Sequence, residues 1–160
     1  MLAGQRVALI GLGHDRPLPR YLASLGASIE TSQGEIEALA DMDFLIDGLG
    51  LPALRQQTGW TAEQIAEVNP RMVHVSVSPF GSYGPGSDLL GSELVASALS
   101  GTLRLTGDPD RPPVKEALDA CTFHAEMVAA AGAMAANPAA PATSIHNVRR
   151  LARRWRAAAR

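Results

Sequence analysis

The segment from Asn69 to Gly107 constrains the fold of this chain more than any other feature. It contains an alternating apolar run at Met72–Ser78, a loop rich in glycine and proline, and a small-residue stretch at Ser92–Ser100. This order predicts a strand that leads through a glycine-rich loop into a helix, which is how α/β proteins build nucleotide and phosphate sites. The segment therefore favours an α/β fold with a ligand site at the end of this strand.

The rest of the chain alternates between short apolar runs and segments with helical spacing. Further strands are expected at Arg6–Ile10, Ala27–Glu30 and Phe44–Ile46. Helices are expected at Pro19–Leu25, at Thr61–Val68 with Thr61 as N-cap, at Ser92–Ser100 and at Thr122–Ala136, with a weak helical turn at Ile36–Ala40. Such alternation predicts a Rossmann-like parallel sheet with flanking helices.

Length and composition limit the possible classes of protein. The chain has 160 residues, of which 46% are hydrophobic and 19% charged, as is ordinary for one globular domain with a real core. No apolar run is long enough to cross a bilayer, and the N-terminus has no secretory signal pattern. The single cysteine, Cys121, excludes an internal disulfide and fits a reducing compartment. These features predict a cytoplasmic protein without a membrane partner.

Charge divides the chain into a body and a tail. The formal net charge is −2, yet the last twelve residues hold six arginines and no acidic residue, which leaves the remainder strongly acidic. We expect an α/β domain at 1–136, a Pro/Ala linker at 137–143 and an Arg-rich helix at 144–160. That helix could dock on its own acidic domain, contact a partner chain or remain a solvated tail. We expect no nucleic-acid binding, because no basic domain surrounds the helix.

Two long motifs resemble those of the class III CoA-transferase family, which includes formyl-CoA transferase, carnitine CoA-transferase and α-methylacyl-CoA racemase. They are N-P-R-M-V-H-V-S-V-S-P-F-G-S-Y-G-P at Asn69–Pro85 and the segment at Leu89–Val114, which contains L-L-G-S-E-L-V and L-T-G-D-P-D-R-P-P-V. Leu2–Gly11 and Leu22–Glu30 look like the family's opening strand and helix. The resemblance covers most of residues 1–136 and implies the fold of the first half of the family's large domain.

The resemblance implies that the loop after the Met72–Ser78 strand lies against bound CoA or acyl-CoA. The matching residues are Ser78, Pro79, Phe80, Gly81 and Gly84, and Lys115 stands where the family often has a basic residue. Glycines permit close backbone approach, and a phenyl ring offers a packing face. Alternatively, the loop is a tight turn without a ligand and Lys115 is a surface residue. The histidines and the cysteine show no metal-ligand spacing, so no metal is expected.

The catalytic residues implied by the resemblance are missing. Transferases of this family use an aspartate that forms an anhydride and then a CoA thioester, and the matching position here is Thr122. Threonine cannot form a mixed anhydride. Asp119 and Glu126 offer carboxylates nearby, and His124 is a weak candidate base. The histidine of the racemase branch corresponds to Ser92.

Two further departures concern CoA binding and length. The Asp47–Pro52 segment lacks the asparagine and arginine that help to hold CoA in the family. Family members are also far longer, so the resemblance implies a truncated subunit that needs a homo- or hetero-oligomeric partner to cover its open sheet edge and apolar helices. We expect this subunit to bind acyl-CoA or support assembly, and to be inactive alone. A free-standing enzyme of altered acyl-CoA chemistry, using Asp119, His124 or Glu126, and a non-catalytic structural or binding protein are the alternatives.

Overall fold

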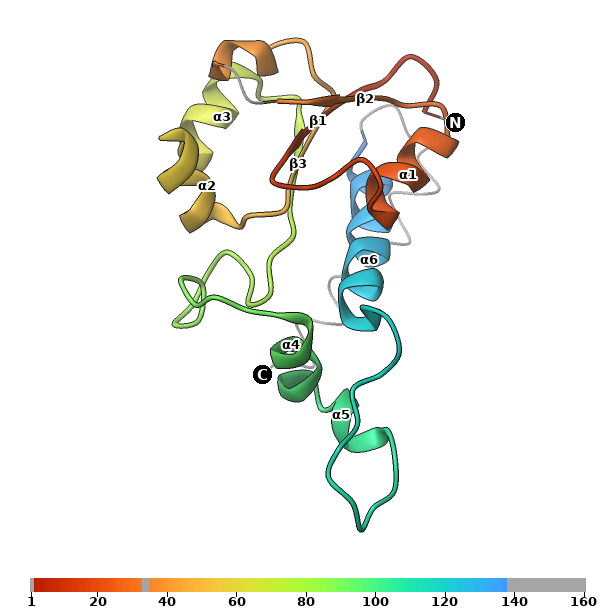
Figure 1. Ribbon diagram of the computed structural model, residues 1–160. Helices are drawn as coiled ribbons and strands as arrows, with labels where there is room; N and C mark the ends of the chain where they lie inside the picture. The colour runs from red at the N-terminus through yellow and green to blue at the C-terminus, as the bar shows by residue number, and fades with distance from the viewer. Residues whose placement is uncertain (1, 33–34, 138–160) are drawn as a thin grey trace.

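Four short strands form one parallel sheet (Figure 1). The computed structural model describes residues 2–32 and 35–137. The order across the sheet is β2 (Ser28–Thr31), β1 (Arg6–Ile10), β3 (Phe44–Asp47) and β4 (Val73–Ser76). β1 pairs with β2 and β3, and β3 pairs with β4, in parallel throughout. The predicted α/β class with a parallel, Rossmann-like sheet is therefore confirmed.

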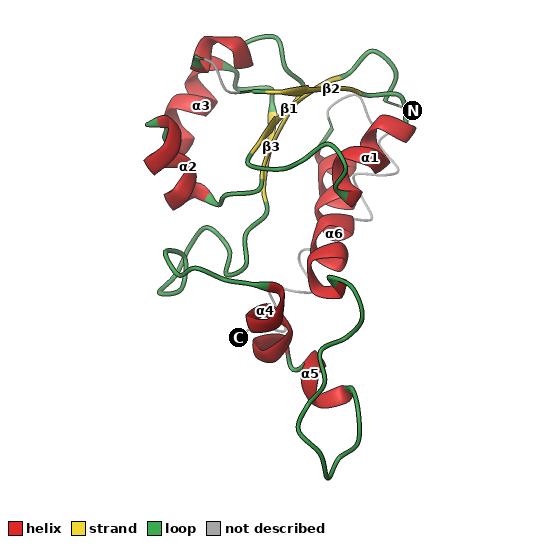
Figure 2. Ribbon diagram, viewed as in Figure 1, coloured by secondary structure: helices red, strands yellow, loops and turns green. Residues whose placement is uncertain are grey.

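Helices cover both faces of the sheet (Figures 1 and 2). α1 (Pro17–Ser24) and α6 (Ala120–Ala136) lie on one face, and η1 (Ile36–Leu39), α2 (Leu51–Thr58) and α3 (Ala62–Val68) lie on the other. Successive strand residues contribute to opposite cores, because side chains alternate along a strand. The first core includes Val7, Leu9, Leu18, Leu22, Phe44, Ile46 and Ala130, and the second includes Ala8, Ile10, Leu39, Leu45, Leu54, Trp60 and Ile65.

The predicted strands and helices are present, with changes at their ends. α1 begins at Pro17 rather than Pro19. Thr61 caps α3 as expected, because the Gln64 N–H donates to its hydroxyl while the Gln64 side chain accepts from the Thr61 N–H. α2 and the short α5 (Thr102–Leu105) are additions to the predicted elements.

The chain between the sheet and α6 forms an arm that projects away from the sheet (Figure 1). This arm, residues 92–119, contains α4 (Glu93–Ser100), α5 and the loop that leads into α6. Ser92 caps α4, because its hydroxyl accepts from the Val95 N–H at 3.4 Å. α6 contacts both α4 and β4 and thereby joins the arm to the sheet. The arm exposes large apolar side chains, among them Leu94, Leu99, Leu105, Val114 and Leu118.

Two predicted segments lie outside the described residues: the Arg-rich helix at 144–160, and the linker at 137–143 apart from Asn137, which ends α6. Both stay predictions. Within residues 2–32 and 35–137, no helix combines the length and the apolar character needed to cross a membrane.

Candidate functional site

A cavity of about 260 Å³ lies at the carboxyl ends of β1, β3 and β4. The chain passes from β1 to β2 on one side of the sheet and then to β3 on the other, so the connections diverge between β1 and β3. Open α/β sheets bind ligands in the crevice outside the strands at such a point. Its walls are the loops after the strands and the first turns of α4 and α6: Leu12, Arg16, Gly48, Val77, Ser78, Pro79, Gly91, Ser92, Glu93, Ala96, Cys121, Thr122, Ala125 and Glu126.

Two glycines let these walls approach each other. A Cβ atom on Gly48 would lie 2.8 Å from the Gly11 carbonyl oxygen, where the loops after β3 and β1 meet. A Cβ atom on Gly91 would overlap the ring of Pro79, where the start of α4 meets the loop after β4. A larger residue at either position would push two walls of the cavity apart.

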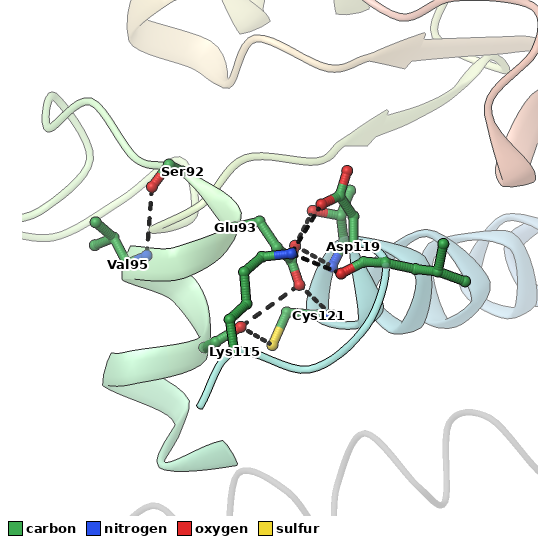
Figure 3. A network of polar contacts seen from close by, with 9 residues as sticks. Ser92, Glu93, Val95, Lys115, Asp119 and Cys121 are labelled. Atoms are coloured by element: carbon green, nitrogen blue, oxygen red, sulfur yellow. Dashed lines mark hydrogen bonds and ion pairs between the residues drawn. The ribbon is translucent and has the colours of Figure 1, made fainter. Parts of the chain in front are cut away.

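Glu93 links α4 to the first turn of α6 (Figure 3). Its carboxylate accepts from the Cys121 N–H at 2.7 Å, from the Thr122 N–H at 3.0 Å and from the Thr122 hydroxyl at 2.6 Å. The first N–H groups of a helix have no partner within it, and the N-cap residue Asp119 makes no side-chain capping bond. Glu93 therefore caps α6 from another helix, with its charge at the positive end of the helix dipole.

The surroundings of Glu93 favour its ionised form. Partial burial disfavours the charge, but hydrogen bonds from the Thr122 hydroxyl and from the Cys121 and Thr122 N–H groups, with the charge of Lys115, lower the pKa of Glu93 below its usual value. Glu93 thus presents a carboxylate to the cavity at neutral pH. It is absent from the sequence-predicted site, although it is the acidic residue of the L-L-G-S-E motif.

The sequence-predicted catalytic candidates fall in two places. Thr122 and Glu126 line the cavity, whereas Asp119 and His124 line a separate depression of about 410 Å³. Lys115 Nζ lies 3.5 Å from the Asp119 carboxylate, so these two predicted residues pair with each other (Figure 3). Of the three predicted candidates, the structure therefore places only Glu126 on the same cavity as Thr122.

Glu126 is fully buried, and both of its carboxylate oxygens are engaged. Arg16 Nε donates to Oε1 at 2.9 Å, and the Leu18 N–H donates to Oε2 at 3.0 Å. The ion pair ties the loop after β1 to α6 across the back of the cavity. A carboxylate held in this way has a structural role, and attack on a substrate would leave the guanidinium of Arg16 without its partner.

Cys121 places its thiol among three hydroxyl groups. Its Sγ lies 3.3 Å from Ser97 Oγ, 3.6 Å from Thr102 Oγ1 and 3.8 Å from Ser100 Oγ. Hydrogen bonds with Ser97 and Thr102, with a smaller contribution from Ser100, lower the pKa of the thiol although partial burial and the charge of Glu93 oppose this. Cys121 is thus a second ionisable side chain on the cavity wall that sequence reasoning missed.

The glycine-rich loop contributes its first two residues to the cavity. Ser78 and Pro79 line it, and the buried Ser78 hydroxyl has no hydrogen-bond partner among the described residues. Gly81 lies instead on a groove of about 540 Å³ between β4 and α6. Gly81 and Gly84 have left-handed φ angles of 77° and 95°, which favour glycine. The predicted contacts of this loop, Phe80 included, with CoA stay predictions.

Asp47, at the end of β3, anchors a polar network that the sequence did not reveal. Its carboxylate accepts from the Gly50 N–H at 2.7 Å and from the Ser76 hydroxyl at 3.2 Å, and lies 2.7 Å from His74 Nε2. The strand register places Asp47 opposite Ser76. The network holds the loop that brings Gly48 to the cavity. Among the described residues, no group of three or more His, Cys, Asp or Glu side chains is arranged to hold a metal ion.

Known proteins match this chain in sequence. The sequence model of the family described as CoA-transferase family III matches residues 37–143. A formyl-CoA:oxalate CoA-transferase of Streptomyces avermitilis is 32% identical over 94 residues, or 57% of this chain and 22% of that protein. A succinyl-CoA–D-citramalate CoA-transferase of Chloroflexus aurantiacus is 28% identical over 122 residues, or 74% of this chain and 30% of that protein. The matches thus span about a fifth to a third of these curated relatives.

Solved structures share the fold at low sequence identity. A CAIB/BAIF family protein from Brucella suis superposes with a TM-score of 0.72 at 19% identity, over 84% of this chain and 48% of that one. A mutant protein from Mycobacterium tuberculosis gives a TM-score of 0.69 at 16% identity, over 83% of this chain and 48% of that one. The fold described above therefore corresponds to about half of each solved structure.

Proposed function

Because this chain belongs to CoA-transferase family III, we propose that it binds CoA or acyl-CoA in the cavity at the carboxyl ends of β1, β3 and β4. The observation that carries this proposal is the cavity itself, where Ser78 and Pro79 of the family-like loop meet Glu93 and Thr122. A volume of about 260 Å³ suits the thioester end of acyl-CoA, with the rest of the molecule extending over the outer surface.

The chain acts as one subunit of an assembly in the cytoplasm. The uncovered apolar side chains of the arm support a partner, either a second copy or a longer chain of the same family. The partner completes the site, so the chain alone is expected to perform no full transfer cycle.

The alternative enzyme, which would use Asp119, His124 or Glu126, has less support from the geometry. Asp119 and His124 line a different depression. Glu126 is held by Arg16 in the core. The buried Ser78 hydroxyl on the cavity wall, which has no hydrogen-bond partner among the described residues, favours a ligand site over a purely structural role.

Isothermal titration calorimetry with CoA and with succinyl-CoA tests the proposed site. Ala96→Leu fills the cavity from α4 without removing a polar group, and we expect it to weaken binding about tenfold or more, which corresponds to about 1.4 kcal/mol. Ala98→Leu, on the exposed face of the same helix, is the matched control and should leave binding unchanged. Equal affinity in all three proteins would place the site elsewhere.

A further inference from the structure

We infer that Glu93 is the carboxylate that accepts the acyl group in this chain, an inference that rests on the proposed function. Exchange of an acyl group through a covalent enzyme intermediate needs a carboxylate that can attack the thioester carbonyl. Thr122 cannot supply one. Glu93 brings a carboxylate to the same place from α4, with Oε2 2.6 Å from the Thr122 hydroxyl oxygen.

Access distinguishes Glu93 from the other carboxylates near the cavity. Glu93 is partly exposed and lies on the cavity wall. Glu93 and Glu126 both accept hydrogen bonds at both carboxylate oxygens, but Glu126 is fully buried and its charge is paired with Arg16. Asp119 lies on the separate depression. Glu93 is therefore the carboxylate on this wall that a thioester can reach.

The first turn of α6 suits a carboxylate that loses and regains its charge. The Cys121 and Thr122 N–H groups and the Thr122 hydroxyl hold Glu93 in its ionised, attacking form. These three donors remain in place when Glu93 is acylated, and they stabilise the negative charge that develops on its oxygen when a thiolate attacks the carbonyl carbon. The same donors thus serve both halves of the exchange.

The exchange balances without another reactant. Glu93 attacks the thioester carbonyl, a C–O bond forms, the C–S bond breaks, and CoA leaves as a thiolate while Glu93 becomes a mixed anhydride. The thiolate then attacks the Glu93 carbonyl carbon, a C–S bond forms, and the bond between that carbon and the bridging oxygen of the anhydride breaks. The products are a Glu93–CoA thioester and the free carboxylate of the former acyl group, with no net proton transfer.

The test is to trap this intermediate on the full chain. The protein is incubated with succinyl-CoA, quenched with hydroxylamine and mapped by peptide mass spectrometry. We expect a hydroxamate at Glu93, and without hydroxylamine a protein mass raised by that of CoA less one water. Glu93→Gln should abolish both signals, whereas the matched control Glu67→Gln, on the exposed face of α3, should keep them.

A rescue variant separates chemistry from capping. The double variant Glu93→Gln, Thr122→Asp returns a carboxylate to the first turn of α6, and the hydroxamate is expected at position 122. A purely structural role of Glu93 predicts no adduct in the native chain, whereas an adduct in the double variant alone would show that the cavity accepts the chemistry and that Glu93 does not perform it. Circular dichroism confirms that each variant is folded before trapping.

The outcomes are distinct. If calorimetry shows CoA binding but no adduct forms at Glu93, the inference is wrong and the proposed function stands. An adduct on Cys121 instead of Glu93 overturns it in favour of the thiol. If neither CoA nor succinyl-CoA binds, both the proposed function and the inference fail.

Discussion

Glu93 and Glu126 are two carboxylates on one cavity that are held in opposite ways. Glu93 is partly exposed and accepts hydrogen bonds from two N–H groups at the N-terminus of α6 and from the Thr122 hydroxyl. Glu126 is 0% exposed and receives them from the guanidinium of Arg16 and the Leu18 N–H. At the scale of single residues, the first arrangement leaves the carboxylate accessible from the cavity, whereas the second commits the carboxylate to the fold.

Removal of Arg16 tests the structural role of Glu126. Arg16→Ala leaves a buried carboxylate with one backbone donor, and we expect the free energy of unfolding to fall by about 3 kcal/mol. Arg6→Ala breaks the surface pair with Glu30, whose side chains are 42% and 47% exposed, and should lower the free energy of unfolding much less. Urea unfolding at neutral pH measures both. Equal losses would mean that Glu126 is not held as described.

The capping role of Glu93 predicts a pH-dependent stability. Its pKa is lowered in the folded state, so its contribution is present above the unfolded-state pKa and is lost as the pH falls through the lowered value. Glu93→Gln should therefore reduce the free energy of unfolding by about 1 kcal/mol at pH 7. The difference from the native chain should shrink steadily below about pH 4.3. A difference that stays constant from pH 7 to pH 3 contradicts this assignment.

At the scale of elements, the cavity depends on how closely α4 approaches the loop after β4. Gly91 sits at that contact, against the ring of Pro79. Gly132 lies on α6, with open space where its Cβ would stand. The two glycines therefore predict opposite responses to the same substitution.

Gly91→Ala should lower CoA affinity about tenfold or more, because the added methyl group pushes α4 away from Pro79. The matched control, Gly132→Ala, should leave the affinity unchanged and raise the free energy of unfolding by about 0.5 to 1 kcal/mol, because alanine is the better helix former. Calorimetry and urea unfolding of both variants test this. A native affinity in Gly91→Ala would show that the approach of α4 does not shape the site.

The sequence predicts the sheet well because each strand is a short apolar run, as at Arg6–Ile10 and Phe44–Asp47. It misses α2, because the polar residues Arg55 and Gln56 interrupt the apolar pattern of this helix. Pro52 at its start and Gly59 at its end are the signals that could have located it. Glu93 was missed for a different reason. Its partner Thr122 is 29 residues away, and only the packing of α4 against α6 brings the two together.

At the scale of the whole molecule, the arm stands out because the described residues leave many of its apolar side chains uncovered. Its apolar side chains reach high exposure, 86% at Leu105 and 87% at Leu118, and Leu90 just before it is 99% exposed. Large apolar side chains exposed in such number on one part of a globular protein point to an interaction site. The proposed assembly accounts for this exposure, because a partner on the arm would cover these side chains.

We therefore expect the purified chain to form an oligomer, homomeric or with a longer relative, through the arm. Multi-angle light scattering should give a mass above that of one chain, and the double variant Leu90→Glu, Leu105→Glu should shift it toward the monomer, because a charge buried at an interface costs several kcal/mol. Ala23→Glu, on the exposed face of α1, is the control and should leave the mass unchanged.

A truncation after Thr143 tests whether the arginine-rich segment contributes to the oligomer, as its Trp155 and arginines predict for an interface. A stable monomer in the native chain, purified alone and with any co-purifying protein, would show that the arm is simply exposed and that the subunit proposal is wrong.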